Sequence, residues 1–166
     1  MELQPAPLTA ETFAAFGEVI ELESARQIRI NQGLTTRYHD LFEIDVNDQG
    51  GKPIVNVFRT SPLPLPHQVT VMERHPLGSQ AFVPLGHDPF LVLVANAVEK
   101  IRAADLHLFI TNGKQGINLR KNTWHHFQIV IGKTQSFLVI DRGGRGNNLV
   151  EAEVADQPVW IPAHFS

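Results

Sequence analysis

The sequence predicts an all-β fold, a sandwich or barrel of short strands preceded by one short helix. The chain has 166 residues, which suits one domain, and its 12 glycines and 11 prolines punctuate it with turns. Short β-type runs recur between these turns. No helical stretches separate the runs, which argues against a parallel doubly wound sheet. We therefore expect a single domain over residues 1–166.

The helix signal lies near the N-terminus, between Leu8 and Gly17. Thr9 is a residue type that caps helix N-termini, and Glu11 places negative charge in the first turn, where the helix dipole favours it. Leu8 and Phe13 have the spacing of a hydrophobic staple, and Gly17 is typical of a helix stop. The pattern predicts a short helix that begins after Thr9.

Eight strands are expected after Gly17. Each is a short apolar or alternating run, and Gly, Pro, Asn or Asp residues separate the runs. The proline-rich stretch 62–66 is too short for a domain linker and is expected to be an extended connection. The expected strands are 18–22, 54–59, 68–73, 80–85, 90–97, 106–111, 125–131 and 136–141.

The composition excludes several classes of protein and of site. Lys and Arg number 14 and Asp and Glu 17, so no basic excess is present to bind nucleic acid. The N-terminus has no secretion signal, and the longest apolar run, 90–98, is about half a membrane span, so we expect a soluble cytoplasmic protein. The chain contains no cysteine. Any metal must therefore be bound by its eight histidines, by carboxylates or by amide oxygens.

The expected strand 68–73 leads into the first candidate site. Residues two apart share a face of a strand, so Val69, Val71, Glu73 and His75 fall together. If the valines face the core, Glu73 and His75 enter the mouth of the barrel side by side. A carboxylate and an imidazole at this spacing can bind one cation or act as an acid–base pair. Alternatively, both residues lie exposed where the strand enters solvent.

Two adjacent histidines begin the expected strand 125–131. His125 shares the parity of the apolar residues Phe127 and Ile129, so it is the better candidate to face inward. His126 is expected to face outward or to support the site from behind, because neighbours in a strand point to opposite faces. The alternative is that His125 is a buried core histidine beside Trp124.

The pair Glu73 and His75, followed about fifty residues later by His125, resembles the cupin superfamily. The usual first cupin motif is His-x-His, three or four residues, Glu, six residues, Gly. Here Glu73 takes the place of the first His, Gln80 takes the place of Glu, and Gly86 comes one residue early. The resemblance implies a jelly-roll barrel, a double-stranded β-helix, with His75, Gln80 and His125 as metal ligands. Gln is a neutral ligand, so weaker metal binding is expected.

Longer segments of the sequence resemble one family more closely than they resemble the general cupin motifs. Several segments resemble the ureidoglycolate lyases and appear in the order found in that family. The most specific are Glu73-Arg74-His75-Pro76-Leu77-Gly78-Ser79-Gln80-Ala81-Phe82 and Ile140-Asp141-Arg142-Gly143-Gly144. The others are segments 30–34, 37–41, 109–113 and 124–126.

This resemblance implies a cytoplasmic homodimer with a cupin-type barrel. It implies an enzyme of allantoin degradation in purine catabolism, which splits the small molecule (S)-ureidoglycolate into glyoxylate and urea. A divalent metal, nickel in some members, is associated with the family, and no organic cofactor is expected. No nucleic acid or membrane partner is expected.

The expected reaction assigns roles to the candidate residues. Glu73, His75 and His125 are the candidate catalytic residues, with Glu73 and His125 sharing the roles of base and acid in an order left open. Arginine pairs well with the substrate carboxylate, and amide, phenol and carboxylate groups can bind the rest. Alternatively, each arginine forms a surface ion pair, Asn31 and Tyr38 belong to an ordinary turn, and Asp141 and Arg142 lie in a strand-ending turn with a local ion pair. The candidate substrate-binding residues are Asn31, Arg37, Tyr38, Gln80, Asp141 and Arg142.

Two other functions stay open from the sequence alone. An amidohydrolase acting on the same compound would release ammonia in place of urea. A non-catalytic barrel that binds a small ligand is the second alternative, because one fold hosts many functions.

Overall fold

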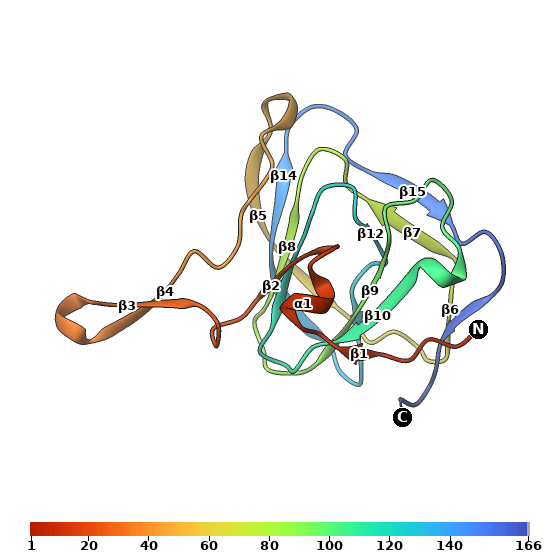
Figure 1. Cartoon of the computed structure of the whole chain (residues 1–166), viewed down its shortest axis with the longest axis horizontal. Coiled ribbons are helices and arrows are strands. Elements are labelled where there is room, and N and C mark those ends of the chain that lie inside the picture. The colour runs from red at the N-terminus through yellow and green to blue at the C-terminus, as the bar shows by residue number, and fades with distance from the viewer. Residues whose placement is uncertain (166) are drawn as a thin grey trace.

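Two β-sheets carry most of the chain (Figure 1), of which the computed structural model describes residues 1–165. The seven-stranded sheet contains β1 (Ala6–Pro7), β7 (Val71–Arg74), β9 (Phe90–Ala95), β10 (Leu106–Ile110), β12 (Trp124–His125), β13 (Ile129–Val130) and β15 (Val150–Glu153). The five-stranded sheet contains β2 (Gly17–Ile20), β5 (Lys52–Thr60), β8 (Gln80–Pro84), β11 (Gly116–Leu119) and β14 (Gln135–Gly143).

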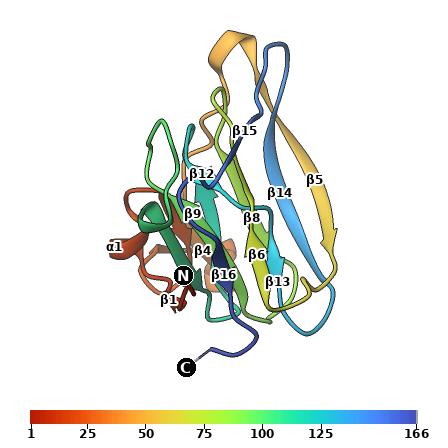
Figure 2. The ribbon, with the colours of Figure 1, turned by 90° about the vertical axis from the view of Figure 1, so that its right-hand side faces the viewer.

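The strands of each sheet come from distant parts of the sequence. The first sheet has the order β1-β10-β9-β12-β7-β15, with β13 also paired to β9, and the second has the order β2-β11-β8-β14-β5. The two sheets face each other, with β5 and β14 on one side and β9 and β12 on the other (Figure 2). This is the all-β, cupin-type jelly roll with one short helix, so the predicted fold class is confirmed.

Two smaller sheets complete the fold. Strands β6 (His67–Val69) and β16 (Val159–Ile161) pair with each other, and so do β3 (Arg26–Ile30) and β4 (Thr35–His39). A 3₁₀ turn, η1 (Asn31–Gly33), joins β3 to β4, and the resulting hairpin reaches away from both large sheets (Figure 1). Further 3₁₀ turns are η2 (Asp48–Gly50) and η3 (Ala103–Asp105).

The predicted helix is present as α1 (Ala10–Phe13). Thr9 caps it as expected, because the backbone N–H of Thr12 donates to Thr9 Oγ1 at 3.1 Å. Leu8 and Phe13 are both buried in the same apolar cluster, as the staple spacing predicts. The role predicted for Gly17 is wrong, because Gly17 begins β2. A Cβ atom at Gly17 would lie 2.0 Å from the carbonyl oxygen of Asn118 on β11, so the close approach of these strands requires glycine.

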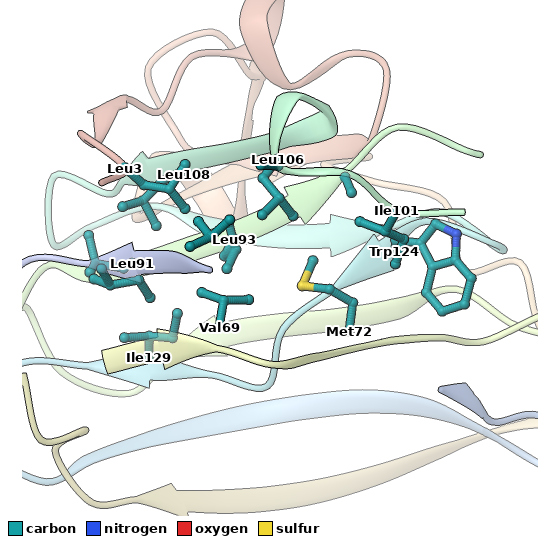
Figure 3. Packing of buried hydrophobic residues seen from close by; sticks show 14 residues of the cluster. Leu3, Val69, Met72, Leu91, Leu93, Ile101, Leu106, Leu108, Trp124 and Ile129 are labelled. Carbon is teal, nitrogen blue, oxygen red and sulfur yellow. The ribbon is translucent and has the colours of Figure 1, made fainter. Parts of the chain in front are cut away.

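Both faces of the seven-stranded sheet are buried, and β9 shows this directly. Its residues alternate between two apolar clusters, one between the two large sheets and one on the outer side. Figure 3 shows part of the outer cluster, in which Leu91 and Leu93 of β9 lie near Val69 and Met72. Val92 and Val94 belong to the inner cluster, together with Phe82 and Val139 of the facing sheet. The run of apolar residues in β9 is therefore explained by burial on both faces.

The register across the sheet carries two site residues to the inner side. Val94 of β9 pairs with His125 of β12, and His125 pairs with Glu73 of β7. Directly paired residues point to the same face, so Glu73 and His125 share the face of Val94 and point between the sheets.

Two of the predicted strands are broken in the structure. The run 68–73 is divided between β6 and β7, and Val69 and Met72 pack in the same outer cluster. The prediction that Val69 shares a face with Glu73 is therefore wrong, because the break at Thr70 resets the alternation. The run 125–131 is likewise divided into β12 and β13, which both pair with β9. Among the residues that the structure describes, no helix is long and apolar enough to cross a membrane.

Candidate active site

Glu73, His75 and His125 meet between the two large sheets. One ligand atom from each of the three lies within 4.8 Å of the others. Glu73 Oε1 is 3.3 Å from His125 Nε2, and the two imidazole rings are 5.1 Å apart, centre to centre. The side chain of His125 is 4% exposed and that of Glu73 is 30% exposed, so the cluster is shielded yet still reachable.

Backbone carbonyls fix the orientation of both imidazoles. His75 Nδ1 lies 2.7 Å from the carbonyl oxygen of Asn148, and His125 Nδ1 lies 3.0 Å from that of Thr123. A carbonyl oxygen can only accept, so each Nδ1 carries the proton. Both Nε2 atoms are buried and accept no hydrogen bond from residues 1–165. In the neutral rings, two lone pairs therefore stand beside the Glu73 carboxylate.

The charge state of Glu73 depends on this arrangement. The pKa of its carboxyl is lowered, first because the protonated form of His125 donates to it. Burial opposes this shift by disfavouring the charged form, and the positive charges that His125, His75 and His126 can carry support it. Glu73 is thus an ionised carboxylate, suited to accept a proton or to bind a cation.

His126 lies closer to the site than the alternation of strand residues predicted. β12 ends at His125, and His125 and His126 both line a narrow cavity of about 20 Å³, which is room for one water molecule. Of the two alternatives predicted for His126, the outward orientation is therefore wrong, and support of the site from behind stays a prediction. Burial lowers the pKa of His126 to about 4, so this residue is neutral at physiological pH.

Gln80 and Asp141 form a second polar group on the five-stranded sheet. They share the inward parity of Phe82 and Val139 on β8 and β14. Gln80 Nε2 donates to Asp141 Oδ1 at 2.7 Å, and Asn56 Nδ2 donates to Asp141 Oδ2 at 3.0 Å. Gln80 Oε1 is buried and has no hydrogen-bond partner in the described part of the chain. The sequence reasoning missed Asn56, which no motif marks.

The other candidate substrate-binding residues lie elsewhere. Asn31 lies in the 3₁₀ turn of the projecting hairpin, where its side chain donates to Thr35 Oγ1. Arg37 and Tyr38 are in β4 of the same hairpin. The structure therefore does not bring these three residues to Glu73 and the histidines within one copy of the chain.

Arg142 is buried and bonded to the backbone. Its Nε and Nη2 donate to the carbonyl oxygen of Asp48 at 3.2 and 2.6 Å, and Nη2 also donates to that of Arg145 at 2.9 Å. Gly51 and Gly78 pack so closely on its side chain that a Cβ atom would collide with it. Arg142 thus ties three loops together and has the opposite parity to Asp141.

The cluster suits a divalent metal on its own chemistry. Two imidazole nitrogens and one carboxylate oxygen are ligands that nickel, zinc, copper and iron accept. The hydrogen bond from each Nδ1 to a backbone carbonyl is the contact that usually orients a metal-binding histidine. The unpartnered Nε2 atoms of His75 and His125 are the groups that a metal would satisfy. On the five-stranded sheet, Gln80 Oε1 is likewise without a partner among the described residues.

Comparisons with known proteins agree on one family. The family model described as ureidoglycolate lyase matches residues 1–162. The protein named ureidoglycolate lyase from Burkholderia mallei (strain NCTC 10229) is 51% identical over 155 residues, which cover 93% of this chain and 90% of the relative. The proteins of that name from Chelativorans sp. (strain BNC1) and Pseudomonas syringae pv. syringae (strain B728a) are 47% and 42% identical. The matches cover 87% of both chains for the first, and 93% of this chain and 91% of the relative for the second.

Proposed function

Because the chain belongs to the ureidoglycolate lyase family, and is thus a lyase, we propose that it cleaves (S)-ureidoglycolate into glyoxylate and urea. The observation that carries this proposal at the level of residues is the polar contact between Glu73 and His125, oriented by backbone carbonyls on the inner face of the sheet.

The reaction requires two proton transfers. One carbon of the substrate carries a hydroxyl, a carboxylate and a urea nitrogen. A base removes the hydroxyl proton, the oxygen's electrons form the carbonyl of glyoxylate, and the C–N bond breaks with its electrons moving to nitrogen. An acid then protonates that nitrogen to give urea. A well-placed acid or base is worth about 10²–10⁴-fold in rate.

Glu73 fits the role of base because its lowered pKa keeps it ionised. His125, protonated at Nε2, then fits the role of proton donor to the urea nitrogen. The 3.3 Å contact between Glu73 and His125 allows the proton taken by the carboxylate to return to the imidazole, which restores both groups after each turnover. We assign His75 and Gln80 to substrate binding, with Asp141 holding the Gln80 amide in place.

Alternatively, His75, Gln80 and His125, together with Glu73, hold a divalent metal, nickel by family resemblance. Such a cation, when bound, would lower the pKa of the substrate hydroxyl as it does that of a bound water. His125 Nε2 has one lone pair and cannot ligate a metal and carry the proton at the same time. Metal content therefore decides between the two uses of His125.

The assembly and location expected of the family complete the proposal. We propose a cytoplasmic homodimer that acts on a small molecule and binds no nucleic acid. The net charge of −3 supports the last point, because a phosphate backbone would be repelled rather than neutralised.

The test is direct. Purified protein is incubated with ureidoglycolate, both after chelator treatment and with added nickel, and urea, glyoxylate and ammonia are measured. Equal amounts of urea and glyoxylate without ammonia support the lyase. Ammonia in place of urea would identify an amidohydrolase, and no turnover under any condition would leave only a binding role.

A further inference from the structure

The hairpin formed by β3, η1 and β4, which we call the arm (residues 26–39), joins no other sheet of the described residues. Its two strands pair only with each other. Leu34 at its tip is 88% exposed, and Ile30 and Tyr38 are exposed as well. An isolated two-stranded hairpin is marginally stable at best in water. An arm that projects as in Figure 1 therefore lacks the packing that would hold it.

The outer face of the five-stranded sheet is also uncovered. On this face, Leu138 of β14 pairs with Val57 of β5 on one side and with Val83 of β8 on the other. Ile140 of β14 pairs with Val55 of β5. Val55 and Val57 are 65% and 62% exposed. A sheet with one solvated face normally carries polar residues there. We call this face the outer patch, which consists of Val55, Val57, Val83, Leu85, Leu138 and Ile140.

A groove joins the arm to the outer patch. It has a volume of about 680 Å³, and its lining includes Gln27 and Tyr38 of the arm and Val83 of the outer patch. The arm and the patch thus border one concave surface, and a partner that fills the groove would touch both.

Charge distinguishes the arm from the groove. The arm contains Arg26, Arg29 and Arg37 and no acidic residue. Within the described residues, none of these arginines forms an ion pair with a carboxylate. Glu21, Glu23 and Lys114 line the groove, which leaves its charged lining with a net negative charge. A basic arm and an acidic groove on one chain are complementary between two copies of that chain.

We propose that the arm of each subunit packs into the groove and onto the outer patch of a second copy. In a twofold symmetric dimer the same contact occurs twice, so both arms and both apolar faces are covered and no surface of this kind is left to recruit a third copy. This inference rests on the homodimer proposed above and adds the surface that forms it.

One test changes the outer patch. Val57→Asp places a charge on a side chain that one copy leaves exposed, so the variant should fold. We expect wild type to sediment at twice the 18.5 kDa chain mass, and Val57→Asp to raise the dimer dissociation constant about tenfold or more, as loss of a central contact does. Ala97→Asp, an exposed position on the loop after β9, is the matched control and should leave the dissociation constant unchanged.

A second test uses the lack of cysteine in the chain. Leu34→Cys and Val57→Cys are prepared separately, mixed so that subunits exchange, and treated with a bis-maleimide linker. The proposal expects a cross-linked species that contains one chain of each variant. A mixture of Leu34→Cys with Ala97→Cys should not give it.

The outcomes separate the proposals. A dimer that resists Val57→Asp and gives no Leu34–Val57 cross-link overturns the arm contact but leaves the homodimer. A monomeric wild type overturns both. Urea release by the wild type, measured on the same sample, tests the lyase function independently of either result.

Discussion

Glu73 and His125 occupy directly paired positions on β7 and β12, and this pairing brings Oε1 of one within 3.3 Å of Nε2 of the other. His125 Nδ1 donates its proton to the carbonyl oxygen of Thr123. Nε2, the atom that faces Glu73, therefore has a lone pair unless the ring is protonated. Two acceptors at this distance need a proton or a cation between them. The pair is therefore built to hold either one.

Replacing Glu73 by Gln should remove most of the activity. The amide has the same shape but cannot take up the hydroxyl proton, so we expect kcat to fall by about 10²–10⁴-fold. Steady-state urea release measures this, with circular dichroism to confirm the fold. Glu99→Gln is the matched control, because Glu99 is an exposed carboxylate on the loop after β9. Turnover of Glu73→Gln within a few-fold of wild type would exclude Glu73 as the base.

Metal content should depend on the two oriented imidazoles. If a divalent metal is bound, elemental analysis of the purified protein should find about one ion per chain, and His75→Ala and His125→Ala should each lose it. His164→Ala, at an exposed histidine, should retain it. A chelated, metal-free sample that keeps full activity would contradict the metal-bound form and favour the acid–base pair.

Asp141 should act by positioning Gln80. Asp141→Ala removes the acceptor at 2.7 Å from Gln80 Nε2, so the free Oε1 is no longer held in one direction. We expect kcat/KM to fall about tenfold, the loss of one well-made hydrogen bond to a charged group. Asp141→Asn keeps an oxygen acceptor and should recover part of the activity. Equal losses in both variants, with equal melting temperatures, would show that the negative charge matters and not the positioning.

Gly17 should be intolerant of substitution. A Cβ atom at this position would lie 2.0 Å from the backbone oxygen of Asn118, so Gly17→Ala must displace β2 from β11. We expect a loss of about 2 kcal/mol or more in the free energy of unfolding, measured in urea. Gly86→Ala is the control, since a Cβ there meets only the end of the Asp88 side chain at 3.8 Å, and it should be nearly neutral.

The sequence predicted the parts of the fold in which local pattern and tertiary packing agree. The cap at Thr9, the staple of Leu8 and Phe13, and the strand containing Phe90 all lie where expected. The pattern failed where the chain breaks inside an apolar run, at Thr70 and after His125, because nothing local marks the break. The hairpin strands were missed because the polar run from Arg26 to His39 lacks the apolar alternation of a strand packed on a core.

The candidate site was also predicted only in part. Glu73, His75 and His125 were predicted from the alternation of strand residues, and the structure brings them together. The alternation itself was wrong, because Val69 and Ile129, which were expected to share their faces, pack in the outer cluster. The supports of the site were not found. The imidazole of His75 is oriented by a hydrogen bond to the backbone carbonyl of Asn148, which any residue could supply. Asn56 reaches Asp141 only because β5 pairs with β14. Such contacts depend on register, which the sequence leaves open.

Arg142 offers a test that separates a structural role from substrate binding. Its guanidinium already donates to the carbonyls of Asp48 and Arg145, and Gly51 and Gly78 pack on its side chain. Arg142→Ala would remove these hydrogen bonds and open a cavity beside Gly51 and Gly78, so we expect a loss of about 2–4 kcal/mol in the free energy of unfolding. The folded fraction should keep a KM near that of wild type.

The control for this comparison is Arg145→Ala, because the side chain of Arg145 is exposed and only its backbone oxygen is used. It should change neither the free energy of unfolding nor KM. A substrate clamp would behave in the opposite way, since losing a guanidinium that binds a carboxylate raises KM and leaves folding nearly intact. A large rise in KM for Arg142→Ala, without loss of stability, would therefore return Arg142 to the substrate site and require the loops around Asp48 to move when substrate binds.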